Sequence, residues 1–182
     1  MAINKRLINT GGVSLPVLGD FIEGGIVYYI NPSDPTQGMV MSLAYVGNTY
    51  TWWNGFYWYV SDATSVNIGD DFVNTTNIIN ALGSGTYAAS VARSYTYGGY
   101  TDWSLPTRNS LTALYQNRTL LSNSAVANGG QALRTSSTAS RHWSSSSVNS
   151  TSSWRVWLST GATEQSGMND DHAVRPVRAF QL

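Results

Sequence analysis

Residues Ser140–Phe180 have the sequence SRHWSSSSVNSTSSWRVWLSTGATEQSGMNDDHAVRPVRAF, in which large apolar residues are separated by small polar ones. The apolar residues that recur along it are Trp143, Trp154, Val156, Leu158, Val174, Val177 and Phe180. A disordered segment would lack them, and an ordinary core strand would carry less Ser, Thr, Asn and Asp. The pattern predicts a folded segment whose apolar residues lie in the core while its polar residues face outward on loops and strand faces.

The composition bounds the class of protein. The chain has 182 residues, enough for one domain with a substantial core. Charged residues make up 11% of it, against about 25% in ordinary globular proteins, and the formal net charge is zero. Because a nucleic-acid-binding surface needs clustered basic residues, this balance argues against a nucleic-acid partner. The absence of cysteine excludes disulfides, thiolate metal ligands and a cysteine nucleophile.

Apolar runs are short throughout the sequence. None approaches the roughly 20 residues that span a bilayer, so we expect no membrane insertion. Residues 1–20 lack the apolar segment of a secretory signal and are predicted to form an arm before a single domain at 21–182. A virion component released by lysis would fit the absence of a visible signal peptide.

The first half of the domain alternates strand-like and helix-like segments. Residues 24–30 (GGIVYYI) and 39–46 (MVMSLAYV) are rich in β-branched and aromatic residues and flank a Pro-containing turn, which predicts a hairpin. Helices are predicted at 74–83, at 86–95 and after Thr107, which is a suitable N-cap.

The stretch 51–60 (TWWNGFYWYV) is dense in aromatic residues around Asn54-Gly55, a strong tight-turn signal. Two interpretations are open. It forms a hairpin that caps the core, which is the one we adopt, or it forms an aromatic binding platform.

In the C-terminal part, the segment WRVWL alternates. Trp154, Val156 and Leu158 share one face, predicted to be buried, and Arg155 and Trp157 share the other.

Residues 173–180 (AVRPVRAF) predict a closing strand, in which Pro176 must lie at an edge, a strand start or a bulge. Arg175 and Arg178 are interpreted as scaffold residues that bond carbonyls or pair with a carboxylate such as Asp102. The predicted class is α+β, with strands from the two ends of the domain adjacent.

Several segments resemble a known family in order, most specifically GGYTDWSLP, HWSSS and VRPVRAF. The chain resembles the bacterial and phage C-type-lectin-like domain at the C-terminus of collagen-like adhesins, near the formylglycine-generating-enzyme branch of that fold. The resemblance covers roughly residues 20–182. It implies a C-type-lectin-like fold with a small antiparallel sheet core, two to three short helices and long loops. It departs at Ser110, where an acidic residue usually completes a capping box, and the cysteine-dependent chemistry of formylglycine generation is excluded.

Residues 142–180 also resemble the variable region of proteins diversified by retroelements of phages and archaeal viruses. In that family a C-type lectin fold presents a ligand-binding face, and AAC codons are randomised to NNC. Such codons encode small polar residues but not Trp, Met, Glu, Gln or Lys, so Trp157, Glu164, Gln165 and Met168 are incompatible. The compatible positions are Ser147, Val148, Asn149, Ser152, Ser153, Arg155, Ser159, Ala162, Ser166, Asn169, Asp170, Asp171, His172 and Ala173.

These positions together with Trp157 are the predicted ligand-binding residues. Arg155, Trp157 and the loop 169–173 are predicted to form one contiguous face, because Trp and Arg are enriched at binding hot spots and small polar residues form adaptable rims. Two alternatives are open: the chain's own loops cover Trp157, or the Ser/Thr-rich loops have no binding role.

No catalytic or cofactor motif is found. His142 and His172 lie outside any Ser-His-Asp or zinc pattern and are interpreted as surface residues. Asp170, Asp171 and His172 could chelate a cation such as calcium with Asn169 only from a loop, because consecutive residues of a strand point to opposite faces. A solvated acidic turn is the favoured interpretation.

The predicted function is non-enzymatic binding of a receptor protein or glycan on a host or neighbouring cell, by a protein displayed on a virion or cell surface. The alternatives are a non-variable virion decoration or adhesin protein and, least favoured, an enzyme.

Overall fold

The computed structural model describes residues 14–182, so residues 1–13 of the predicted 1–20 arm lie outside the described part. The strands are β1 (Phe21–Ile22), β2 (Gly25–Ile30), β3 (Gln37–Ser42), β4 (Arg141–Ser147), β5 (Ser152–Trp157), β6 (Thr163–Gly167) and β7 (Val177–Gln181). The α-helices are α1 (Asp71–Leu82), α2 (Ala88–Ser94), α3 (Arg108–Gln116) and α4 (Arg118–Ala127), with 3-10 turns at Ser61–Ala63 and Ser137–Ser140. The α+β class is confirmed, with α4 as an additional helix.

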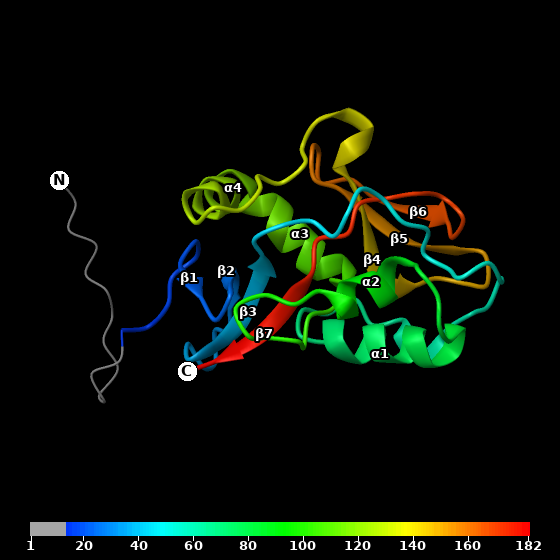
Figure 1. The fold of residues 1–182 in the computed structure, drawn as a ribbon, viewed down its shortest axis with the longest axis horizontal. Coiled ribbons are helices and arrows are strands. Elements are labelled where there is room, and N and C mark those ends of the chain that lie inside the picture. Colours follow the sequence, from blue (N-terminus) through cyan, green and yellow to red (C-terminus); the bar gives the residue numbers. More distant parts are fainter. Residues whose placement is uncertain (1–13) are drawn as a thin grey trace.

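Two antiparallel sheets lie toward opposite ends of the molecule (Figure 1). The first has the order β1-β2-β3-β7 and the second has the order β4-β5-β6. The predicted hairpin is confirmed as β2 and β3, although β3 ends at Ser42. The closing strand β7 begins directly after Pro176 and pairs with β3, so strands from the two ends of the domain are adjacent as predicted.

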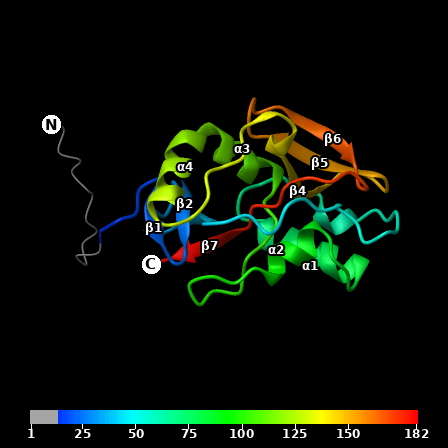
Figure 2. The same ribbon diagram turned by 45° about the horizontal axis from the view of Figure 1, so that its top comes forward.

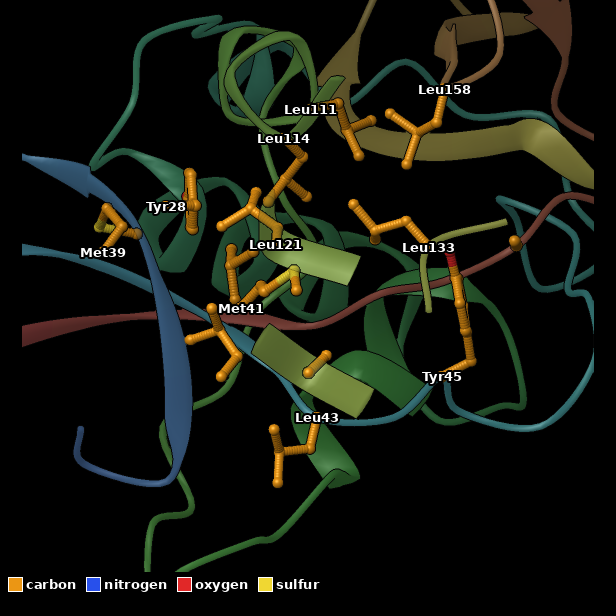
Figure 3. Close-up of a cluster of buried hydrophobic side chains, with 14 of the residues drawn as sticks. Tyr28, Met39, Met41, Leu43, Tyr45, Leu111, Leu114, Leu121, Leu133 and Leu158 are labelled. Carbon is orange, nitrogen blue, oxygen red and sulfur yellow. The ribbon is translucent and has the colours of Figure 1, made fainter. Parts of the chain in front are cut away.

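The main hydrophobic core lies between the first sheet and the helices α3 and α4 (Figures 2 and 3). Met41 of β3 packs in one buried cluster with Leu114 of α3 and Leu121 of α4. Val156 and Leu158, at the end of β5, belong to the same cluster. This core therefore joins the two sheets through α3.

A second core supports the three-stranded sheet from the side of α1 and α2. Two fully buried tryptophans in it also make specific hydrogen bonds. The indole N–H of Trp52 donates to the carbonyl of Ser144 at 2.8 Å, and that of Trp143 donates to the carbonyl of Tyr50 at 2.8 Å. These reciprocal bonds fix β4 against residues 50–52.

The N-terminus of α3 is capped by residues from two segments. The Thr107 hydroxyl accepts from the backbone N–H of Ser110 at 3.2 Å, which confirms the predicted cap. The backbone N–H of Thr107, which an acidic residue at Ser110 would otherwise bind, donates instead to the carboxylate of Asp71 at 2.6 Å. Burial raises the pKa of Asp71. The missing half of the capping box is thus supplied by the first residue of α1.

The hairpin predicted for 51–60 was wrong. These residues form bends and coil rather than strands. Only Trp52 and Val60 are buried, and the residues between Gly55 and Val60 are exposed. The tight-turn signal was correctly located, since Gly55 has a φ of 106° that favours glycine, but no cross-strand partners flank it.

Residues 172–177 form a buried extended segment between the two sheets. Its backbone bonds to Tyr50, to Arg141 and Trp143 of β4, and to Ser42 at the end of β3. At its centre the guanidinium of Arg175 is fully buried and donates to the carbonyls of Ser42, Leu43 and Gln131 at 2.9–3.0 Å. Burial lowers the pKa of Arg175 to about 10, so the side chain stays charged at neutral pH.

Arg178, on β7 of the first sheet, binds two carboxylates from outside the strands. Its Nε donates to Asp102 at 2.6 Å and its Nη1 donates to Glu23 at 2.8 Å. Both arginines therefore serve the scaffold, as the sequence predicted.

Replacing Arg175 by Met should destabilise the fold by about 3 kcal/mol or more, because three carbonyls lose a charged donor in a buried site. Urea unfolding followed by circular dichroism measures this change. The control Arg118→Met removes a partly exposed guanidinium bonded within its own neighbourhood, to the Tyr115 carbonyl, and should change stability by less than about 1 kcal/mol. Equal effects of the two variants would refute the structural role of Arg175.

Candidate functional site

The three-stranded sheet has two distinct faces. Val156 and Leu158 are fully buried, as predicted, against the main core. Trp154, which shares their face, is only partly buried, and the guanidinium of Arg108 lies 5.0 Å from its ring centroid. The prediction that Trp154 is a core residue was therefore wrong. Its ring packs against the Arg108 side chain at the start of α3 rather than in the core.

On the opposite face, Arg155 and Trp157 bind the same carboxylate. Nη2 of Arg155 and the indole N–H of Trp157 both donate to Oε2 of Glu164 on β6, each at 2.9 Å. These bonds lower the pKa of Glu164, the one from Trp157 most. The guanidinium of Arg141 lies over the Trp157 ring at 4.4 Å from its centroid, an arrangement that favours cation–π attraction. Trp157 is partly exposed and is held in one orientation.

Arg155 also reaches the segment 169–173. Its Nη1 donates to the Ser166 hydroxyl at 3.0 Å and lies 3.1 Å from Nε2 of His172. The Ser166 hydroxyl donates in turn to Asp170 at 2.5 Å. Arg155, Trp157 and the 169–173 segment therefore belong to one contiguous surface, which we call the Arg155 face and define by Arg141, Arg155, Trp157, Glu164 and Asp170.

The predicted ligand-binding residues divide into three groups by exposure. The exposed ones are Asn149, Ala162, Asn169, Asp170 and Asp171. The partly buried ones are Val148, Ser152, Arg155, Trp157 and Ser159. The buried ones are Ser147, Ser153, Ser166, His172 and Ala173. The last group has no side-chain surface to offer a ligand, so its members support the site from below.

The buried serines correct the expectation that polar residues in this region face outward. Ser144, Ser145, Ser146 and Ser147 of β4 are all buried. The Ser144 hydroxyl donates to the Trp154 carbonyl at 2.8 Å, and that of Ser146 donates to the Ser65 carbonyl at 2.7 Å. Small hydroxyl residues are used here because they satisfy carbonyls of irregular segments that pass close to the strand.

The two histidines are also buried, so their prediction as surface residues was wrong. Nδ1 of His142 lies 2.6 Å from the Ser140 carbonyl and must carry the proton, and its Nε2 accepts from the Tyr45 hydroxyl at 2.8 Å. Burial lowers the pKa of His142 to about 3. Burial and then the Arg155 cation lower the pKa of His172 to about 4.

Ser166 and His172 do not form a hydrolase triad. Their Oγ and Nε2 atoms are 2.9 Å apart, but Asp170 accepts from the Ser166 hydroxyl, whereas a triad carboxylate orients Nδ1 of the histidine. Within residues 14–182, no group of three His, Asp or Glu side chains is placed to hold a metal ion. Asp170 instead serves as an exposed acceptor of the Arg155 face.

A family model, the Lcl C-terminal domain, matches residues 42–178, from the end of β3 into β7. This chain belongs to the Lcl C-terminal domain family. The family is broadly the adhesin C-terminal family to which the sequence resemblance pointed. No curated protein matches the chain significantly.

The matched region contains all five residues of the Arg155 face. Within the described residues of this Lcl C-terminal domain, no helix has the length and apolarity needed to cross a bilayer.

Sequence reasoning missed two residues of the Arg155 face in this Lcl C-terminal domain. Arg141 lies opposite Trp157 in the β4–β5 register, and Glu164 lies opposite Arg155 in the β5–β6 register. Cross-strand pairing of opposite charges on β6 and β5 was the available signal. Using it required the register of β6, a strand that is mostly exposed and has no apolar pattern.

In this Lcl C-terminal domain, neither histidine should titrate near its ordinary pKa of 6.5. Below pH 6.5 the unfolded chain takes up protons that the folded protein does not, so these residues make the free energy of unfolding fall as the pH drops toward 4. The raised pKa of Asp71 acts in the opposite direction at acidic pH. NMR titration of the imidazole resonances measures the pKa of each histidine separately from Asp71. A His172 titration midpoint near pH 6.5 would contradict the buried arrangement.

Proposed function

We propose that this domain is a non-enzymatic ligand-binding module of a protein displayed on a virion or cell surface, and that it binds its receptor through the Arg155 face. Membership of an adhesin-type family supports a binding role. We further propose that the scaffold is a C-type-lectin-like one, on the sequence resemblance and on the pairing of β7 with β3 near the chain's start.

The observation that carries the proposal is the shared bonding of Arg155 and Trp157 to Glu164. It holds two side chains of the types enriched at binding hot spots in fixed orientations, so little conformational entropy would be lost on association. The exposed residues 169–171 lie beside them in a loop. A rigid centre next to an adaptable polar rim is the arrangement found in efficient protein-binding surfaces.

A protein receptor fits this face better than a glycan does. The face carries both charge signs, with Arg141 and Arg155 beside Glu164 and Asp170. Mixed charges around an aromatic residue favour a partner with a complementary pattern of its own. A virion decoration protein would not need Arg155 and Trp157 to be held by Glu164 at a partly exposed surface.

Trp157→Ala should weaken binding of the labelled domain to receptor-bearing cells at least tenfold, because it removes the aromatic centre of the face. Flow cytometry on a panel of bacterial and animal cells measures this. Pretreating the cells with protease should abolish binding if the receptor is a protein. The matched control is Phe21→Ala, which removes an exposed aromatic side chain from β1 of the other sheet. Equal binding by wild type and Trp157→Ala would exclude the Arg155 face.

Retroelement diversification is a second proposal. The exposure of the NNC-compatible positions restricts which of them could be diversified. Asn149, Ala162 and residues 169–171 lie in loops, and each is compatible with an NNC codon. Substitution at such positions changes stability little. The exposed Glu164 and Gln165 are not reachable by NNC codons, and compatible residues such as Ser153 are buried. We therefore propose that any diversified set is limited to the exposed loops.

Substitution by tyrosine, which NNC codons encode, distinguishes the exposed positions from the buried ones by its effect on stability. Asn169→Tyr should change the free energy of unfolding by less than about 0.5 kcal/mol, because the site is exposed. Ser153→Tyr should cost about 1–3 kcal/mol or more, because the site is filled. Thermal unfolding measures both. In the coding DNA, a nearby reverse-transcriptase gene and AAC codons at the exposed loop positions would support diversification, and their absence would favour a fixed adhesin.

A further inference from the structure

The loop at 53–60 exposes an unusual concentration of aromatic surface. Phe56 is 75% exposed, Tyr57 51%, Trp58 62% and Tyr59 43%. These are four consecutive residues, and contiguous exposed apolar surface on a soluble domain usually marks a site of interaction. The segment following β3 reaches the end of the molecule far from the C-terminus (Figure 2). No residue of the Arg155 face lies in this loop.

The loop is anchored on both sides, so its aromatic residues are presented by a defined backbone. Trp52 is fully buried before it and Val60 is buried after it. The Asn54 side-chain amide donates to the Leu82 carbonyl at the end of α1. The rings of Trp53 and Tyr57 stack with centroids 4.2 Å apart. This arrangement holds Tyr57 in place and leaves Trp58 and Tyr59 at the edge of a groove.

The groove has polar walls behind the aromatic edge. Its volume is about 330 Å³, and it is lined by Trp58, Tyr59, Val60, Ser61, Asp62, Asn77, Asn80 and Ala81. Asn77 lines the groove and its side-chain N–H donates to the Asp62 carbonyl at 2.6 Å, so its amide oxygen is not used by that bond. The side chain of Asn80 is exposed on α1, and its amide group offers both a donor and an acceptor to a ligand in the groove.

We propose that this groove is a calcium-independent binding site for an uncharged saccharide. The face of an aromatic ring carries partial negative charge, which attracts the C–H bonds on the face of a pyranose. Side-chain amides and a carboxylate match the adjacent hydroxyl pairs of a sugar in donor and acceptor pattern. A groove of this size suits one or two sugar rings. The site shares no residue with the Arg155 face, so it stands independently of the proposed function.

The charge of the groove selects the class of saccharide. Asp62 is the one carboxylate among the lining residues, and no Lys, Arg or His lines the groove. A sulfated or uronic-acid polymer would meet a like charge without a cation to pair with, which disfavours it. A lipid surface is disfavoured for the same reason, because anionic headgroups attract basic residues. The residues that line the groove therefore favour an uncharged saccharide.

The test uses the full chain and a defined set of probes. Neutral oligosaccharides of glucose, galactose, mannose and N-acetylglucosamine are titrated while tryptophan fluorescence and binding heat are recorded, with heparin as the charged comparison. At least one neutral oligosaccharide should bind, with a change in tryptophan emission that persists with EDTA present and is absent in Trp58→Ala. Heparin should bind at least tenfold more weakly. Absence of binding by every neutral probe, or binding of heparin alone, overturns the proposal.

Variants locate the site. Trp58→Ala and Asn80→Ala should each weaken saccharide binding about tenfold or more, with thermal unfolding unchanged because Trp58 is 62% exposed. Phe21→Ala, which removes an exposed aromatic side chain from β1, is the matched control and should bind saccharide as the wild type does. Loss of binding in Trp157→Ala but not in Trp58→Ala would place the saccharide on the Arg155 face and refute this site.

The competing occupant of the groove is a second copy of the chain. Sedimentation of the wild type and of Trp58→Ala tests for it, and self-association that the substitution removes would assign the groove to that second copy.

Discussion

The buried guanidinium of Arg175 is the interaction on which the arrangement of the two sheets depends. It binds carbonyls of Ser42 and Leu43 at the end of β3 and of Gln131 after α4. These carbonyls lie at the end of β3 and in the segments that follow β3 and α4, and that of Leu43 also accepts from the backbone N–H of Gln131 at 2.7 Å. One charged side chain supplies all three donors, and the extended segment around it bonds to both sheets. The cation is stabilised by fixed carbonyl dipoles rather than by a carboxylate.

The small polar residues serve two purposes that composition alone does not separate. In β4 the hydroxyl groups of Ser144 and Ser146 lie inside the molecule and donate to carbonyls of neighbouring segments. In the 169–171 loop the small polar residues face solvent. The buried serines of β4 make the support of the Arg155 face rigid, because each hydrogen bond to a carbonyl ties the strand to a neighbouring segment. The loop residues can vary without disturbing that support. The candidate face therefore combines a fixed sheet with a replaceable border.

The sequence predicted those elements whose signals are local. Patterns of adjacent residues were enough to predict the β2–β3 hairpin, the Thr107 cap and the alternation of Arg155 with Val156. The sequence-based predictions failed where the burial of a side chain depends on residues far from it in the sequence. Trp154 is covered by Arg108 and His172 is enclosed with Arg155 and Ser166. The exposed aromatic residues at 56–59 looked like a core-capping hairpin, because their composition does not tell whether another layer covers them.

The pairing of β7 with β3 governs the order in which the chain can fold. The register joins Gln37 to Gln181 and Met41 to Val177, across almost the whole length of the described chain. Closing so long a loop costs conformational entropy before any contact compensates for it, which slows folding relative to domains with local contacts. Until β7 is synthesised, the β2–β3 hairpin presents an unpaired edge at β3, and Arg175 has not yet reached its carbonyls. The nascent domain therefore passes through a state with an open sheet edge, of the kind that chaperones protect from aggregation.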